Sequence, residues 1–149
     1  MKKEYKSSIP EISLQFKDSG FKKTKITSSE DSFKYIRQFY ESDINIYESF
    51  FLLLLNRANN TIGWVKISQG GMTGTVADPL IIAKYAIDFM AKGIILAHNH
   101  PSGVLKPSNN DNELTKKIVQ GMKLFDVNVL DHIILGDKEW FSFADEGLL

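Results

Sequence analysis

Six consecutive apolar residues, Phe50 to Leu55, are the feature that most restricts how this chain can fold. A strand with one face in water alternates apolar and polar side chains, whereas the segment from Ser49 to Leu55 is apolar on both faces. The run is also far shorter than the roughly 20 residues that a membrane-spanning helix needs. We therefore predict a central strand that other elements cover on both sides.

The residues around this run alternate between strand and helix patterns. Asn59-Asn60 and Gly136-Asp137 are typical turn sequences, which makes the first and last strand pairs candidate hairpins. The middle of the chain has the pattern of a crossover, with a helix between strands. This order predicts an α/β fold with a mixed sheet. The further strands are expected at 61–67, 94–97, 127–135 and 139–143.

Three helices are expected between these strands. Ser28 or Ser29 can cap the first, and Asp78 followed by Pro79 predicts the start of the second, which Gly93 would close. Each helix carries an apolar stripe at helical spacing. The stripes are Phe33, Ile36 and Tyr40 in the first helix, Ile82, Ala86 and Phe89 in the second, and Leu114, Ile118, Met122 and Phe125 in the third.

A weak boundary lies near residue 44. Before it, Glu11 to Phe16 alternates as a short strand and precedes the first helix. No repeat or Gly/Ser/Pro-rich linker divides the rest of the chain. We therefore expect an N-terminal extension over 1–45, made of a strand and a helix packed on the core, and one main domain over 46–149.

Cysteine and histidine usage restricts the chemistry. The 149 residues include no cysteine and three histidines, His98, His100 and His132. Without thiolates the chain can form no disulfide, iron–sulfur cluster or cysteine-based zinc finger, and it has no cysteine nucleophile. Any metal site must therefore use histidine and carboxylate ligands.

The charge balance bears on partners and location. The 18 basic and 18 acidic residues cancel, and residues 126–149 hold one basic residue against six acidic ones. Proteins that bind nucleic acid usually gather basic residues on one face, so this pattern argues against direct nucleic-acid binding. The charged amino end leads into no apolar segment of a secretory signal, which predicts a soluble, cytoplasmic protein without membrane contact.

The segment from His98 to Asp111 has the spacing of a catalytic metal site. Residues two apart on a strand point to the same face, so His98 and His100 can direct both imidazoles to one point. A turn follows, and Asp111 in the first turn of the next helix can bring a carboxylate back. Two histidines, one carboxylate and an open fourth position are typical of catalytic zinc, which lowers the pKa of bound water to about 7.

Three further residues have two interpretations each. Glu48 is a candidate acid/base for the water, or an exposed residue before its strand. Ser108 with Asp111 also matches a capping box, which starts a helix without any metal. His132 follows Asp131 in the middle of a strand, where we favour a structural role because buried, hydrogen-bonded histidines are commoner than ligands.

These residues together resemble a known family. His-x-His, seven residues, Ser, two residues and Asp match the JAMM metalloprotease signature of JAB/MPN domains. The fuller string from His98, the preceding GIILA and the later VLDHIIL and SFADEGLL resemble the bacterial RadC family. The resemblance covers roughly residues 46–149.

The resemblance implies a cytidine-deaminase-like JAB/MPN sandwich, with a central mixed β-sheet flanked by helices. In such a domain His98, His100 and Asp111 would bind Zn²⁺, Glu48 would be the general acid/base, and Ser108 would help hold the oxyanion. Characterised eukaryotic relatives are isopeptidases that remove ubiquitin-like modifiers, which implies a peptide or isopeptide substrate.

Two departures from the family pattern keep other functions open. The first 45 residues resemble no helix-hairpin-helix DNA-binding region, which suggests a truncated form, and Leu80 stands where family members tend to carry arginine. The leading hypothesis is a zinc peptidase or isopeptidase. The alternative is a non-catalytic binding module, associated with DNA repair or mobile elements through a protein partner. A metal-dependent nuclease is a third hypothesis, which the neutral charge opposes. The sequence indicates no oligomeric state.

Overall fold

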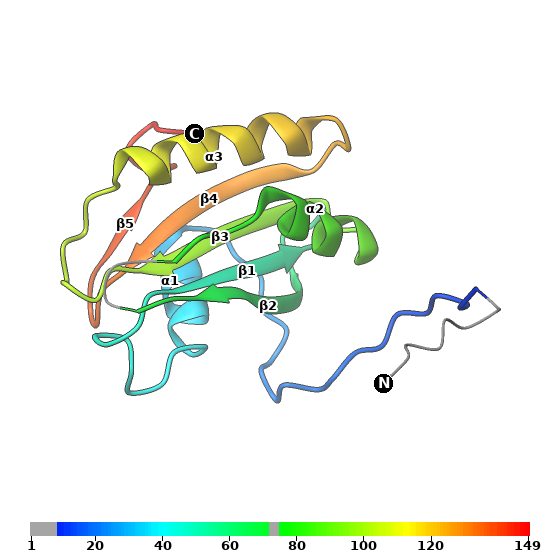
Figure 1. Cartoon of the computed structure of the whole chain (residues 1–149), viewed down its shortest axis with the longest axis horizontal. Coiled ribbons are helices and arrows are strands. Elements are labelled where there is room, and N and C mark those ends of the chain that lie inside the picture. Colours follow the sequence, from blue (N-terminus) through cyan, green and yellow to red (C-terminus); the bar gives the residue numbers. More distant parts are fainter. Residues whose placement is uncertain (1–8, 72–74) are drawn as a thin grey trace, which may run out of the picture.

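The computed structural model describes residues 9–71 and 75–149 (Figure 1). None of the helices in these residues is long and apolar enough to cross a membrane. The elements in chain order are α1 (Ser29–Arg37), β1 (Ser49–Leu55), β2 (Thr61–Gln69), α2 (Pro79–Asp88), β3 (Gly93–Asn99), α3 (Asn109–Lys123), β4 (Asn128–Leu135) and β5 (Trp140–Ser142).

The five strands form one mixed sheet in the order β2-β1-β3-β4-β5. β1 pairs antiparallel with both β2 and β3, and β4 pairs antiparallel with β5. β3 and β4 are parallel, and α3 is the crossover that joins them. The predicted α/β fold with a mixed sheet is confirmed, and every residue of β1 is buried, as a strand covered on both sides requires.

Helices cover both faces of the sheet. On one face, α1 packs through Phe33 and Ile36 against Phe51 of β1 and Ile95 of β3. On the other face, α2 and α3 pack on alternate residues of the same strands, such as Leu96. Because side chains alternate along β3, His98 faces the same side as α2 and α3, and Asn99 faces the side of α1.

The capping residues begin the helices as predicted. The side chain of Ser28, and not that of Ser29, accepts from the backbone N–H of Asp31 at the start of α1. Asp78 accepts from the N–H of Leu80, and Pro79 takes the first position of α2. Each cap satisfies an N–H group that has no partner within its helix.

Three local predictions are wrong. Residues 11–16 form no strand and are exposed, because they pair with no other strand (blue in Figure 1). At the end of this segment the ring of Phe16 packs edge-on against Phe89, with 4.9 Å between centroids. Gly93 does not close α2: Met90, with φ of 52°, makes the left-handed turn, and Gly93 begins β3. Phe125 lies beyond the end of α3 and is exposed, so the buried stripe ends at Met122.

Candidate metal centre

His98 and His100 bring their imidazoles together at the carboxyl end of β3. The Nε2 atoms of the two rings are 2.9 Å apart. His98 is buried with its ring stacked on Phe50, whereas His100 follows the strand and lies at the edge of the site. The Nδ1 of His100 donates to the carbonyl of Val104 over 2.7 Å, because a carbonyl oxygen can only accept. The Nε2 of neutral His100 therefore has a free lone pair directed at the site.

Asp111 reaches the same point from the first turn of α3. Its Oδ1 lies 3.4 Å from Nε2 of His98, and its Oδ2 lies 3.4 Å from Nε2 of His100. The capping box also forms: the N–H of Ser108 donates to Oδ2, and the N–H of Asp111 donates to the Ser108 hydroxyl oxygen. The helix cap and the contact with histidine therefore coexist, and the cap holds the carboxylate toward the imidazoles.

Glu48 approaches from the start of β1. Its carboxylate is only 14% exposed, so it is not the solvent-facing residue that one interpretation of the sequence suggested. Oε2 accepts from the backbone N–H of Thr75 over 2.6 Å, and Oε1 lies 4.0 Å from Nε2 of His100. One oxygen is therefore held by the backbone while the other faces the histidines.

The spacing of these atoms fits a small, tetrahedrally coordinated cation. Ligand atoms about 2.0–2.1 Å from a tetrahedral ion lie roughly 3.3–3.4 Å from one another. Oδ1 of Asp111 lies at this distance from Nε2 of His98, and Oδ2 lies at this distance from Nε2 of His100. The two Nε2 atoms are closer together, at 2.9 Å. Glu48, His98 and His100 also offer one ligand atom each within 4.8 Å of one another. Oε1 of Glu48 lies 4.0 Å from Nε2 of His100, so Glu48 and Asp111 are both candidates for the third ligand.

The charges of the site favour a cation. The hydrogen bond between His100 and Asp111 raises the pKa of His100 above its usual range, although burial of the ring acts to lower this pKa. Burial acts to raise the pKa of Asp111, but the imidazoles of His100 and His98 beside the carboxylate outweigh it and hold this pKa well below its usual range. The carboxylate is therefore ionised at neutral pH and requires a positive partner, either a proton on histidine or a metal ion.

Asn99, between the two histidines in sequence, holds the backbone beside the candidate site, and sequence reasoning missed it. Its side chain is fully buried on the opposite face of the sheet. The amide oxygen accepts from the N–H of Ser49 over 2.8 Å, and the amide nitrogen donates to the carbonyls of Ile44 and Tyr47. Asn99 thereby holds the backbone on both sides of Glu48 and ties it to β3. In the sequence, a polar residue at the end of an apolar strand was the signal that could have identified Asn99.

Replacing Asn99 with alanine should lower the free energy of unfolding by at least about 2 kcal/mol, because three backbone groups, two of them buried, would lose their partner. Urea denaturation monitored by circular dichroism measures the change. The control is Asn112→Ala on the exposed surface of α3, for which the expected change is within about 0.5 kcal/mol. Equal stability of the two variants would contradict the role of Asn99.

His132 and Thr115 lie behind His98. His132 is fully buried in β4, stacks on Phe143 and contacts Nδ1 of His98 through its Nε2 at 2.8 Å. Burial lowers the pKa of His132 well below its usual value. Thr115 of α3 was not identified from the sequence, although a threonine beside the apolar stripe, one helical turn after Asp111, was a usable signal.

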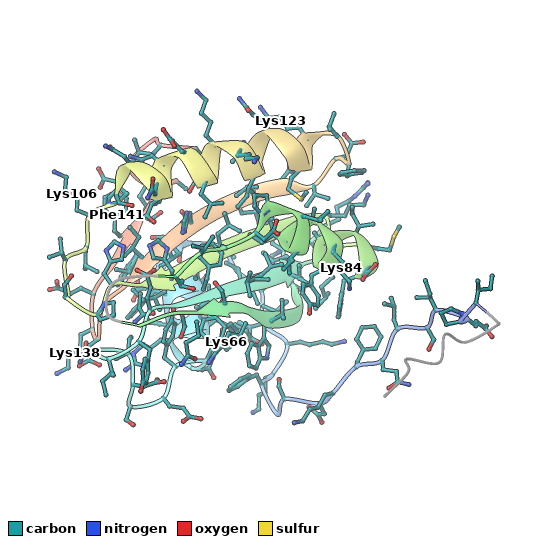
Figure 2. The ribbon with its side chains drawn as sticks, in the orientation of Figure 1. Lys66, Lys84, Lys106, Lys123, Lys138 and Phe141 are labelled. Carbon is teal, nitrogen blue, oxygen red and sulfur yellow. The ribbon has the colours of Figure 1, made fainter. Side chains whose placement is uncertain are left out.

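Charged side chains are dispersed around the body. The five lysines labelled in Figure 2 belong to different places: β2, α2, the segment before α3, the end of α3 and the turn between β4 and β5. Leu80 is exposed in the first turn of α2.

The fold and the site define a class of protein. A mixed five-stranded sheet covered by helices on both faces carries two histidines and a carboxylate that could hold a metal ion, with a second carboxylate beside them. The model of the RadC-like JAB domain matches residues 26–148, which include α1 as well as the main sheet. The chain belongs to this family.

Curated relatives carry family names without a stated activity. The chain is similar to a UPF0758 protein of Flavobacterium johnsoniae, with 42% identity over 124 residues, which is 83% of this chain and 53% of the relative. It is 44% identical over 103 residues to one of Porphyromonas gingivalis, covering 68% of this chain and 45% of that protein. The UPF0758 protein YfjY of Escherichia coli is 41% identical over 102 residues, 68% of this chain and 64% of the relative. The chain thus spans about half the length of the first two.

Proposed function

We propose that this protein is a zinc-dependent hydrolase that cleaves peptide or isopeptide bonds. The observation that carries the proposal is the convergence of His98, His100 and Asp111 on one point, with the free oxygen of Glu48 beside it. Membership of the RadC-like JAB family supports it. Two imidazoles and one carboxylate, with the fourth position open, are the donor set of catalytic zinc.

His98, His100 and Asp111 would hold the ion. When bound, zinc supplies the acidity that makes water a nucleophile near neutral pH and polarises the carbonyl under attack. The residues of the chain provide the geometry for this chemistry. The buried ring of His98 and the capping box around Asp111 keep two of the three ligands oriented before any ion arrives.

Glu48 would move the proton. Its Oε2 stays bonded to the N–H of Thr75, so Oε1 is free to take a proton from the attacking water. The same oxygen can then give this proton to the nitrogen of the leaving amine, which departs neutral. Proton transfer by a positioned carboxylate typically contributes about 10²–10⁴-fold to the rate.

Ser108 would bind the carbonyl oxygen of the substrate. Its hydroxyl oxygen accepts from the N–H of Asp111, which leaves its own hydrogen to donate. Ser108 is exposed at the start of α3. A donor at this position would gain strength as negative charge grows on the oxygen.

A peptide or isopeptide suits the site better than a nucleic acid. Lysines are dispersed over β2, α2, α3 and the loops (Figure 2), whereas a phosphate backbone is usually bound by a basic face. A glutamate that protonates a leaving nitrogen also matches amide chemistry, because an amine is a poor leaving group until it is protonated. The substrate class therefore follows from charge and chemistry together.

Hydrolysis and metal content test the proposal together. We expect about one zinc per chain, and release of new amino termini or lysine amines from pools of linear and isopeptide-linked peptides, detected by mass spectrometry. A chelator should stop cleavage and added zinc should restore it. A protein that binds no zinc, or that with zinc cleaves a labelled oligonucleotide and no peptide, would overturn the proposal.

Zinc affinity should depend on pH because protons compete for the same nitrogen atoms. His100 must be neutral to bind, and the hydrogen bond to Asp111 raises its pKa, so competition begins above the usual value of 6.5. As the pH falls below the raised pKa, the apparent affinity should drop about tenfold per unit for each proton displaced. Competition titrations with a chelator of known pH dependence measure this slope. An affinity that stays constant from about pH 8 to 6 would contradict the ligand role of His100.

A further inference from the structure

A line of buried polar contacts runs from His98 into the interior. Nδ1 of His98 lies 2.8 Å from Nε2 of His132. Nδ1 of His132 lies 2.6 Å from the hydroxyl of Thr115, and that hydroxyl lies 2.6 Å from the carbonyl oxygen of Asp111. His132 and Thr115 are 0% and 1% exposed. The line thus begins and ends at two of the proposed zinc ligands.

The donors and acceptors available assign a direction to each contact. The carbonyl of Asp111 can only accept, so the single hydrogen of the Thr115 hydroxyl points to it. The Thr115 oxygen must then accept from Nδ1 of His132. The ring of His132 contacts the imidazole of His98, the hydroxyl of Thr115 and the aromatic rings of Phe50 and Phe143. It is fully buried, which favours its uncharged form, so its Nε2 has no hydrogen and accepts from Nδ1 of His98.

The opposite direction fits less well. If Thr115 donated to His132, its oxygen would face the carbonyl oxygen of Asp111 at 2.6 Å with no hydrogen between them. His98 would then carry its hydrogen on Nε2, the atom directed at His100 and Asp111. That tautomer has no lone pair for a metal. Hydrogen on Nδ1 of His98 instead leaves the Nε2 lone pairs of His98 and His100 facing each other at 2.9 Å, a contact that a proton or a metal ion would bridge.

We propose that His132 and Thr115 are positioning residues that keep the hydrogen of His98 on Nδ1, so that the Nε2 lone pair faces the metal position. This inference rests on the proposed zinc site. His98 needs such a device because its Nδ1 faces the interior, whereas Nδ1 of His100 is oriented by the carbonyl of Val104. Outer partners of this kind fix the tautomer and orientation of metal-binding histidines.

The helix α3 supplies one proposed ligand and part of the buried line. Asp111 contributes its carboxylate to the site and its carbonyl to the buried line, and Thr115 lies one turn further along the helix. The position of the carboxylate and the tautomer of His98 are therefore set by the same turn of α3. Phe143, stacked on the ring of His132 with 4.6 Å between centroids, holds the middle of the line.

The test compares Thr115→Val, which removes the hydroxyl, with Thr115→Ser, which keeps it. Zinc affinity from chelator competition should fall about 10–100-fold in Thr115→Val and return to within about threefold of wild type in Thr115→Ser. Thr61→Val is the matched control, since Thr61 is also a buried threonine but bonds to Thr24 and Tyr35, away from the site. We expect its zinc affinity to equal that of wild type.

Nitrogen-15 NMR of the histidine rings in the metal-free protein, at about pH 9 where free imidazole is neutral, provides the second readout. We expect hydrogen on Nδ1 of His98 in wild type and in Thr115→Ser, and a mixture of tautomers in Thr115→Val. Hydrogen on Nε2 in wild type would overturn the inference even if no variant folds. So would wild-type zinc affinity in a folded Thr115→Val. Absence of zinc binding in wild type would instead reject the proposed function, while the tautomers of the metal-free protein would still test the buried line.

Discussion

Replacing His98 with alanine is expected to lower zinc affinity by more than about 100-fold. Loss of an outer partner of a metal ligand costs about 10–100-fold, so loss of a ligand itself should exceed that range. His98 is also the buried member of the pair and contacts Asp111, His100 and His132. Without His98, the proposed ligands that remain are His100, at the edge of the site, and the carboxylate of Asp111.

Isothermal titration with a competing chelator measures this effect. Because His98→Ala also opens a small cavity, the control is Met122→Ala, which truncates another buried side chain. Met122 lies on α3 about 16 Å from Asp111, at roughly 1.5 Å per residue. That variant should lose stability and keep its zinc affinity. If His98→Ala remains folded by circular dichroism and binds zinc like wild type, His98 is not a ligand.

Glu48→Gln should reduce peptide or isopeptide turnover by about 10²–10⁴-fold and leave the zinc content unchanged. The amide keeps the size of the side chain, and its oxygen can still accept from the N–H of Thr75. It cannot take a proton from water at neutral pH. The change therefore separates proton transfer from metal binding.

Turnover and zinc content should be measured on the same preparations. Glu113→Gln is the matched control, because Glu113 is an exposed glutamate two residues beyond Asp111 on α3 and points to solvent. Its activity should equal that of wild type. Equal turnover in Glu48→Gln would exclude the acid/base role. A wild-type protein that binds zinc but cleaves neither class of peptide would favour the binding module instead.

The local pattern of residues was sufficient to predict most elements. The unbroken apolar run matches β1, and the capping sequences at Ser28, Asp78 and Ser108 match the starts of the three helices. These features depend on neighbours within a few residues, and local sequence records them directly. The strand expected over 11–16 is wrong for the complementary reason, because a strand needs a partner that its own pattern does not specify.

The spacing of His98, His100 and Asp111 likewise predicted that these side chains could meet, since a strand, a turn and a helix start bring them close within 14 residues of chain. It could not decide between a cap and a ligand for Asp111, or between an exposed and a buried Glu48. Glu48 is 50 residues before His98, and its orientation depends on Thr75 and on the hold of Asn99 over its neighbours. Only the antiparallel pairing of β1 with β3 brings these segments together.

The order of the strands determined which buried residues contact His98. His132 meets His98 because β3 and β4 are parallel neighbours, and Thr115 meets His132 because α3 crosses over that pair. The sequence indicated residues able to bind a metal and the elements that carry them. The hydrogen-bond partners of those residues lie up to tens of positions away, so packing between distant segments, and not local pattern, determines which lone pair faces the site.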